Sequence, residues 1–311
     1  MARNRRDMPP SVVQGRVGMV AELVGFLGES WINWLLVLVP VSWAVELLDV
    51  PRLWVFLFSA LAIIPLAHLI GHGTEQVAGW IGHGPGGLLN AAMGNATELI
   101  ISLFALKAGL ITVVKAAISG SLIGNTLLVL GMSMLVGGWG RDKQTFNRTR
   151  AGATASMLFL AVVALVMPAV FDLEVFGTLR HPAASVDSLS LLVCVVLILT
   201  YMASLVFSLK THREVIPTVH TECDQPRLSL VNSVTLLLAA TVLVAVESEL
   251  LVGGISDATA ALGMTEFFVG IVVVAVVGNA AEYFTAMMMA KRNRMELSVT
   301  IATGAGTQVA L

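Results

Sequence analysis

The chain has 311 residues, of which 57% are hydrophobic and 12% charged, with a mean hydropathy of +0.87 and a formal net charge of -2. Soluble domains carry roughly 25% charged residues, so this composition excludes an ordinary soluble protein and predicts a membrane protein with many spans. Cys194 lies in an apolar run and Cys223 in polar sequence, which excludes a disulfide framework and a CxxC site.

Runs of roughly 17 to 25 mainly apolar residues are long enough to cross a bilayer as helices. In chain order the sequence predicts nine of them: 31–48, 53–71, 87–107, 112–138, 151–171, 188–209, 230–248, 265–290, and a ninth from about 297 to Leu311. The predicted organisation is a cytoplasmic N-terminal arm (1–30), an N-terminal membrane half (31–209), a polar cytoplasmic connector (210–229) and a C-terminal membrane half (230–311). The expected fold class is an all-α polytopic membrane protein.

One pentapeptide occurs in each half of the chain. Gly94–Glu98 (GNATE) returns as Gly278–Glu282 (GNAAE), with an offset of 184 residues. Further residues recur at the same offset: Lys107 with Lys291, and Gly120 with Gly304. A constant offset across separate landmarks indicates two copies of one membrane-embedded unit.

The basic residues indicate the topology of the nine spans. With the N-terminus in the cytoplasm, 14 of the 18 basic residues fall on the cytoplasmic side, as the positive-inside rule requires. The two pentapeptides then lie in the third and eighth spans, which run in opposite directions. The repeat is therefore inverted, and mid-span elements of both halves should meet near a pseudo-twofold axis.

This symmetry predicts that Glu98 and Glu282 face each other near mid-membrane. Gly94 and Gly278 are expected to bend the two spans, because glycine tolerates torsions outside the helical range. An ionised carboxylate at this depth costs at least about 2.5 kcal/mol. The pair can be neutralised by one divalent cation or by two protons. If the protein can pass through its closed state only when the carboxylate pair is neutral, a divalent cation must be carried one way and protons must return. This predicts an antiporter.

The pentapeptides also supply neutral ligands. Asn95 and Asn279 lie three positions before the glutamates and hence on the same helical face. Carboxylate, amide and backbone oxygens form the all-oxygen set that a hard cation with about six to eight ligands prefers.

Other interpretations of these residues exist. A membrane glutamate can hydrogen-bond a neighbouring helix, and the small-residue segments 119–125 and 303–308 can serve close packing as well as ion coordination. His68 and His72, one turn apart and followed by Glu75, could form the metal site of a membrane-embedded metalloenzyme, although no HExxH motif occurs. A site in one half would not need a second copy of the repeat, which favours the antiporter.

The sequence resembles the calcium/cation antiporter superfamily, and within it the calcium/proton exchanger branch. The matching stretches are 94–107 (GNATELIISLFALK), 119–131 (SGSLIGNTLLVLG), 208–214 (SLKTHRE) and 277–286 (VGNAAEYFTA). The resemblance implies an inverted-repeat helical bundle of the sodium/calcium exchanger type that exchanges calcium, or a similar divalent cation, for protons by alternating access. A sodium-coupled exchanger of the same superfamily is the alternative, although such proteins usually carry Ser and Pro where this chain has Asn95 and Asn279.

The resemblance also implies roles for individual residues. Glu98 and Glu282 would be the shared metal and proton sites, supported by a set of polar side chains: Asn95, Asn279, Ser121, Asn125 and Gln308. His72 and Glu75, with Asp257 as a rough counterpart in the second half, are expected to face a water-accessible path as proton-relay or ion-access groups. No catalytic residue, cofactor or nucleic-acid partner is expected, and calcium is a transported substrate.

The chain departs from the family's pattern at three places. His72 stands where the family commonly has an acidic residue, and Ala305 where it commonly has Ser. The family has two further helices, whereas this chain stops at Leu311 in an apolar helix, which predicts a truncated C-terminal end with reduced stability and activity. The implied location is a bacterial inner membrane, or a vacuolar-type membrane in a eukaryote, and the oligomeric state stays open.

Overall fold

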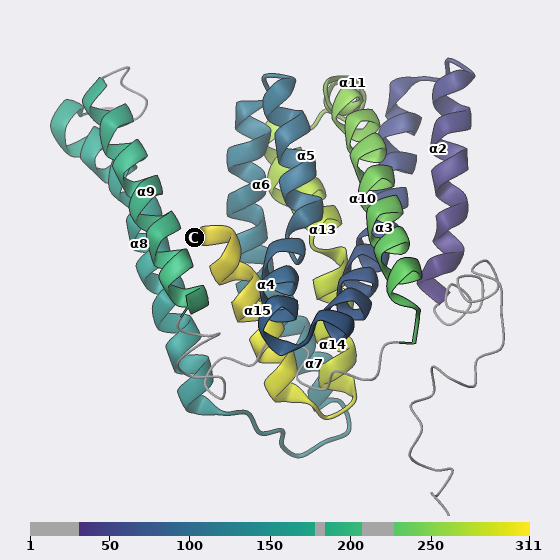
Figure 1. The fold of residues 1–311 in the computed structure, drawn as a ribbon. Helices are drawn as coiled ribbons and strands as arrows, with labels where there is room; N and C mark the ends of the chain where they lie inside the picture. Colours follow the sequence, from purple (N-terminus) through teal and green to yellow (C-terminus); the bar gives the residue numbers. More distant parts are fainter. Residues whose placement is uncertain (1–30, 178–183, 207–226) are drawn as a thin grey trace, which may run out of the picture.

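A computed structural model describes residues 31–177, 184–206 and 227–311 of the chain. The predicted N-terminal arm and most of the connector lie outside these residues. The described secondary structure is helical (Figure 1). The helices, in chain order, are η2 (Trp31–Val37), α2 (Leu38–Leu47), α3 (Arg52–Ile81), α4 (His83–Met93), α5 (Ala96–Lys107), α6 (Ile111–Ile123), η3 (Gly124–Val129), α7 (Leu130–Gly138), α8 (Arg148–Phe176), α9 (Ala184–Val206), α10 (Leu230–Gly253), α11 (Ile255–Leu262), α12 (Glu266–Phe268), η5 (Val269–Val274), α13 (Ala275–Gly278), α14 (Ala280–Lys291) and α15 (Met295–Ala310).

Five helices of the described chain are long and apolar enough to cross a membrane, and two bent helix pairs raise that number to seven. The shorter apolar helix Ile32–Leu47 stands in the place of the first predicted span, and α15 in the place of the ninth. The prediction of an all-helical membrane protein is confirmed. The short helix α11, which follows α10 directly, was not predicted.

The two pentapeptide spans run in opposite directions. In Figure 1 the third span rises from α4 to α5, whereas the eighth span descends from α13 to α14. The structure thus has the inverted arrangement that the repeat and the basic residues predict. The helices α8 and α9 stand at one side of the bundle and meet it at the end of α15, where Ala161, Val193 and Ala310 share an apolar cluster.

Both pentapeptide spans break at the asparagine and not at the glycine. Asn95 has φ -103° and ψ 16°, and Asn279 has φ -103° and ψ 12°, so the same residue leaves the helical range in each repeat. Gly94 keeps helical torsions, with φ -53° and ψ -44°. The bend in the third span measures 43° between Pro85–Met93 and Ala96–Lys107. The predicted interruption is present in both repeats, but the prediction that glycine torsions cause it is wrong.

The glycines instead allow close approach between the halves. A Cβ on Gly278 would lie 2.6 Å from Cγ of Glu98, so the glycine of the second repeat makes room for the glutamate of the first. A Cβ on Gly120 of α6 would overlap the carbonyl oxygen of Ile271 in η5. Small residues commonly let membrane helices pack this closely. For Gly120, close packing is therefore the correct one of the two interpretations.

Two apolar clusters surround this crossing. One gathers Phe56, Ile101 and Val269 from α3, α5 and η5. The other ties α2, α3 and α10 together through residues such as Leu66 and Val244. Apolar packing thus encloses the polar side chains of the pentapeptides. Their available binding partners are one another and any ion or water that enters through a cavity.

Candidate functional site

A network of buried polar side chains holds the carboxylate of Glu98. The Nδ2 atom of Asn279 donates to Oε1 of Glu98 at 2.6 Å and lies 2.9 Å from Oγ of Ser121. Asn125 donates in turn to Oδ1 of Asn279 at 2.9 Å. Asn279, Ser121 and Asn125 are all buried. Four of the predicted site residues, from both halves of the chain, therefore lie in one hydrogen-bonded group.

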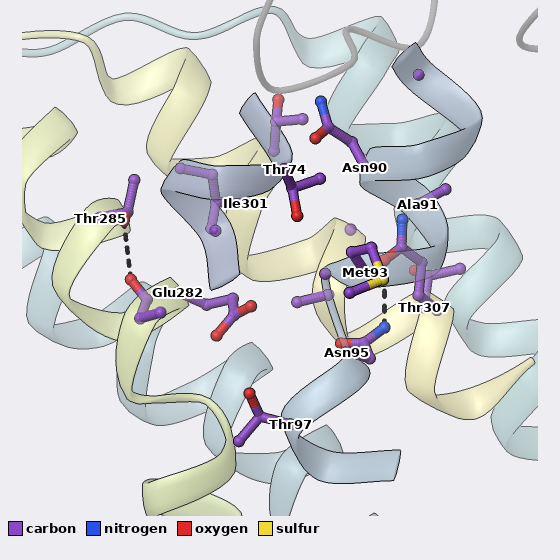
Figure 2. A pocket seen from close by; sticks show the side chains of 18 of the residues that line it. Thr74, Asn90, Ala91, Met93, Asn95, Thr97, Glu282, Thr285, Ile301 and Thr307 are labelled. Carbon is purple, nitrogen blue, oxygen red and sulfur yellow. Dashed lines mark hydrogen bonds between the residues drawn. The ribbon is translucent and has the colours of Figure 1, made fainter. Parts of the chain in front are cut away.

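Glu282 lies beside this network and faces a cavity. The cavity has a volume of about 260 Å³, and Glu282, Asn95 and Gln308 line it. Asn95 donates to Oε1 of Gln308 at 3.2 Å, and Figure 2 shows Asn95 and Glu282 around the same space. Glu98 does not line the cavity, but it interacts electrostatically with Glu282. The structure thus brings the two pentapeptide carboxylates together.

The two glutamates have unequal surroundings although the repeat relates them. Ser121 interacts with Glu98, and the residue 184 positions later is Ala305, which lines the cavity without a hydroxyl group. Oε1 of Glu98 therefore accepts a side-chain hydrogen bond from Asn279, whereas Oε2 of Glu98 and Oε2 of Glu282 are both buried without a hydrogen-bond partner among the described residues. Ala305 and Glu282 line the same cavity, so the second repeat has no hydroxyl group at the position that Ser121 occupies in the first.

Several buried oxygens of this group have no hydrogen-bond partner within the part of the chain that the structure describes: Oε2 of Glu98, Oε2 of Glu282, Oδ1 of Asn125 and Oη of Tyr283. Buried polar atoms are nearly always paired, so each such atom requires an explanation. Carboxylate, amide and hydroxyl oxygens are the ligands that hard cations prefer. The chemistry of this donor set fits a divalent or monovalent hard cation.

Asn279 and Asn95 direct their amide nitrogens, and not their oxygens, toward Glu98 and Gln308. Asn279 presents its nitrogen to Glu98 and its oxygen to Asn125. Asn95 likewise presents its nitrogen to Gln308. A cation bound by Glu98 and Asn279 together would require the Asn279 amide to rotate, so that its oxygen replaces its nitrogen.

Tyr283 is a site residue that sequence reasoning missed. Its side chain interacts electrostatically with both Glu98 and Glu282, and a Cβ on Gly124 would overlap its hydroxyl oxygen. The residue 184 positions earlier is Leu99. Because the repeat carries no tyrosine in its first copy, the internal symmetry gives no signal for this position.

The predicted access residues do not all gather. His72 Nδ1 lies 3.5 Å from Oε2 of Glu75, and Glu75 lines the cavity. The ring of His68 meets that of His72 edge-on, with centroids 4.4 Å apart. Asp257 instead lies on α11, largely exposed and 4.0 Å from Arg52, and it does not line the cavity. Within the described residues, no three histidine, cysteine or acidic side chains are grouped so as to hold a metal ion.

An inverted pair of interrupted helices that brings two carboxylates together inside a membrane bundle defines a membrane ion transporter. The chain belongs to the sodium/calcium exchanger protein family, whose sequence model matches residues 52–210 and 232–311. This family consists of transporters, so the interpretation of His68, His72 and Glu75 as a metalloenzyme site is wrong.

Relatives and a solved structure agree with this assignment. The chain is 41% identical over 294 residues to a Ca²⁺/H⁺ antiporter of Aphanothece halophytica. The matched segment covers 89% of this chain and 78% of that protein. It is 40% identical over 278 residues to the Ca²⁺/H⁺ antiporter ChaA of Bacillus subtilis, over 88% of this chain and 78% of that protein. The solved structure of native YfkE matches 89% of this chain and 78% of its own, with a TM-score of 0.73 and 38% identity.

Proposed function

We propose that this chain exchanges Ca²⁺ for H⁺ across a membrane and that Glu98 and Glu282 bind the two ions alternately. The unpaired buried oxygens of Glu98, Glu282, Asn125 and Tyr283 are the observation that carries this proposal. The names of the relatives at about 40% identity support calcium and protons as the exchanged pair. Asn95, Asn279, Ser121, Asn125 and Gln308 would supply the neutral part of the site.

Charge balance explains why the two ions alternate. Two ionised carboxylates in the closed bundle would each cost at least about 2.5 kcal/mol. One Ca²⁺ or two protons neutralise the pair, and either loaded form can pass through a closed state. The empty site, with two ionised carboxylates, cannot pass through the closed state. The protein therefore carries Ca²⁺ in one direction across the membrane and protons in the other.

The cavity supplies access to Glu282 from one side. Its lining includes Glu75 near the end of α3, Asn90 in the second half of α4 and Thr285 in α14. With the N-terminus in the cytoplasm, these positions lie in the cytoplasmic half of the bundle. The arrangement therefore fits an inward-open state in a bacterial inner membrane, with an apolar cluster around Phe56 and Val269 closing the opposite side.

Transport in reconstituted vesicles tests this proposal. The chain, in vesicles loaded with a pH-sensitive dye, is expected to move protons when a Ca²⁺ gradient is imposed and to take up Ca²⁺ when a pH gradient is imposed. Vesicles with a sodium gradient and no pH gradient serve as the second arm. Calcium uptake driven by sodium and not by protons would replace the proposal with the sodium-coupled alternative.

A hydroxyl group beside Glu282 is expected to tighten cation binding. Ala305→Ser gives the second repeat the group that Ser121 provides in the first. A net gain of about 1 kcal/mol from one such interaction lowers the half-saturating Ca²⁺ concentration by about fivefold. The calcium dependence of proton release measures this, with Ser121→Ala as the reciprocal variant that should weaken binding. Equal calcium dependence in all three proteins would contradict the unequal roles of the two repeats.

His72 and Glu75 are proposed to pass protons between the cavity and bulk water. His72→Ala is expected to change the pH dependence of exchange, because it removes the imidazole that lies beside the carboxyl group of Glu75. His72→Glu, which restores the acidic residue common in the family, should give a different pH profile while keeping transport. If His72→Ala retains the pH profile of the original chain, His72 is not a relay. Asp257 is proposed only as an access group on the opposite side, because it does not line the cavity and pairs with Arg52 at the start of α3.

A further inference from the structure

A third carboxyl group is buried in the bundle, separate from Glu98 and Glu282, which form the proposed exchange site. Glu247 on α10 is 0% exposed, whereas Glu249, two positions later on the same helix, is exposed. Neither Glu98 nor Glu282 is among the interaction partners of Glu247. The residue 184 positions earlier is Ile63, so the internal repeat does not call for an acid here.

Glu247 connects the first span to the rest of the bundle. Its Oε1 atom lies 2.7 Å from Oγ of Ser42 on α2, and Trp43 of α2 and Ser59 of α3 lie close to it, although Oγ of Ser59 makes no hydrogen bond among the described residues. Ser42 and Ser59 are themselves 0% exposed. The residues of α2 precede the segment that the family model matches, whereas Glu247 lies within it. The contact therefore ties a helix outside the matched region to one inside it.

The hydrogen atoms in this cluster can be counted. Oγ of Ser42 lies 2.7 Å from Oε1 of Glu247 and also 2.7 Å from the carbonyl oxygen of Val39. A hydroxyl group has one hydrogen, and a carbonyl oxygen can only accept. If Ser42 donates to Val39, the hydrogen in the contact between Ser42 and Glu247 must come from the carboxyl group.

The surroundings of Glu247 also disfavour a negative charge. Its second oxygen, Oε2, is buried without a hydrogen-bond partner among the described residues. The other titratable groups on α2, α3 and α10 are Glu46, Arg52, His68, His72, Glu75 and Glu249, and none of these is among its interaction partners in the described chain. A buried carboxylate without a cation and without full hydrogen bonding costs several kcal/mol. A neutral carboxyl group has no such cost and supplies the missing hydrogen.

We propose that Glu247 is a proton-binding site separate from the exchange site, and that its bound proton fastens the first span to α10 through Ser42. A protonated Glu247 donates to Ser42, and Ser42 donates to Val39. Without that proton, the carbonyl oxygen of Val39 and the carboxylate of Glu247 both require the single hydroxyl hydrogen of Ser42. One of the two contacts is then lost, so α2 loosens from α3 and α10. The first span is then held by a proton that Ca²⁺ at the exchange site does not displace.

Infrared spectroscopy of the whole chain at neutral pH tests the proton directly, because protonated and ionised carboxyl groups absorb at different frequencies. Saturating Ca²⁺ should remove the protonated-carboxyl signals of Glu98 and Glu282 and leave one signal unchanged. Glu247→Gln should abolish that calcium-insensitive signal, while the control Glu249→Gln should retain it. If Glu247→Gln retains every protonated-carboxyl signal, Glu247 is ionised and the proposal is wrong.

A second variant keeps the test decisive if Glu247→Gln fails to fold. Ser42→Ala removes the acceptor, so the calcium-insensitive signal should persist at a shifted frequency. Amide hydrogen exchange over Ile32–Leu47 should also rise several-fold in Ser42→Ala relative to the original chain. An unshifted signal together with unchanged exchange in α2 would show that no proton links the two helices. Neither readout requires transport, and loss of one protonated-carboxyl signal in Glu247→Gln but not in Glu249→Gln assigns the proton whether or not Ca²⁺ removes the signals of Glu98 and Glu282.

Discussion

Exchange is expected to be lost when either pentapeptide glutamate is replaced by glutamine. Glu98→Gln and Glu282→Gln each leave one negative charge to balance a divalent cation. An uncompensated unit charge in the bundle costs at least about 2.5 kcal/mol, which corresponds to a fall of about 60-fold or more in exchange rate. Glutamine has nearly the same shape and can accept the hydrogen bond that Asn279 now donates to Glu98, so folding should persist.

The measurement is calcium-driven proton movement in vesicles, alongside thermal unfolding in detergent to confirm folding. Glu249→Gln is the matched control, because Glu249 is exposed and lies outside the site. Exchange near the original rate in Glu98→Gln would remove the central role of the paired carboxylates. Loss of exchange in one variant only would show that the unequal shells of Glu98 and Glu282 divide the cation and proton roles between them.

The second large effect concerns the contact between α6 and η5. Gly120→Ala places a methyl group where the backbone of Ile271 now lies, so the two halves must separate. Overpacking of this kind costs about 1–3 kcal/mol, which corresponds to a fall in Tm of roughly 2–5 °C for a chain of this size. Ser121, the next residue, should shift away from Glu98 at the same time, and exchange should fall with stability.

Two glycines offer controls for this substitution. A Cβ on Gly131, in α7 of the same span, or on Gly304, the counterpart of Gly120 in the second repeat, would meet no atom within 4 Å. Both alanine variants should unfold near the Tm of the original chain. If Gly120→Ala is as stable as Gly131→Ala, the two backbones are not in the tight contact that the structure describes.

Most of the correct predictions about the site came from the internal repeat. The constant offset between Glu98 and Glu282 requires related environments, and opposite span directions then require that the two meet. The approximate positions of the spans followed from the length of the apolar runs, because a bilayer sets that length, but α3 ends at Ile81 and α10 at Gly253, beyond the predicted ends at 71 and 248. These inferences depend only on spacing and hydropathy, which one sequence contains.

Features that depend on packing between distant segments were not predictable in the same way. The sequence places a glycine and an asparagine in each motif, but only the crossing of the halves shows that Asn95 and Asn279 interrupt the helices while Gly278 accommodates Glu98. Tyr283 and Glu247 lack counterparts in the other repeat, so symmetry gave no reason to single them out. Asp257 was placed by its spacing alone, and the turn into α11 carries it away from the cavity.

In the proposed exchange, the hydrogen bond from Asn279 occupies a carboxylate oxygen of Glu98 before any ion arrives. An entering Ca²⁺ must first displace an amide donor that lies 2.6 Å from the carboxylate. Hydrogen bonds to charged groups contribute about 1.5–3 kcal/mol, so this internal competitor weakens cation affinity by about 10- to 100-fold. In the proposed cycle, the same donor would return to Glu98 as the ion leaves and would accelerate release. A transporter must release the bound ion in every cycle. A lower affinity than the oxygen ligands alone would give therefore increases its turnover rate.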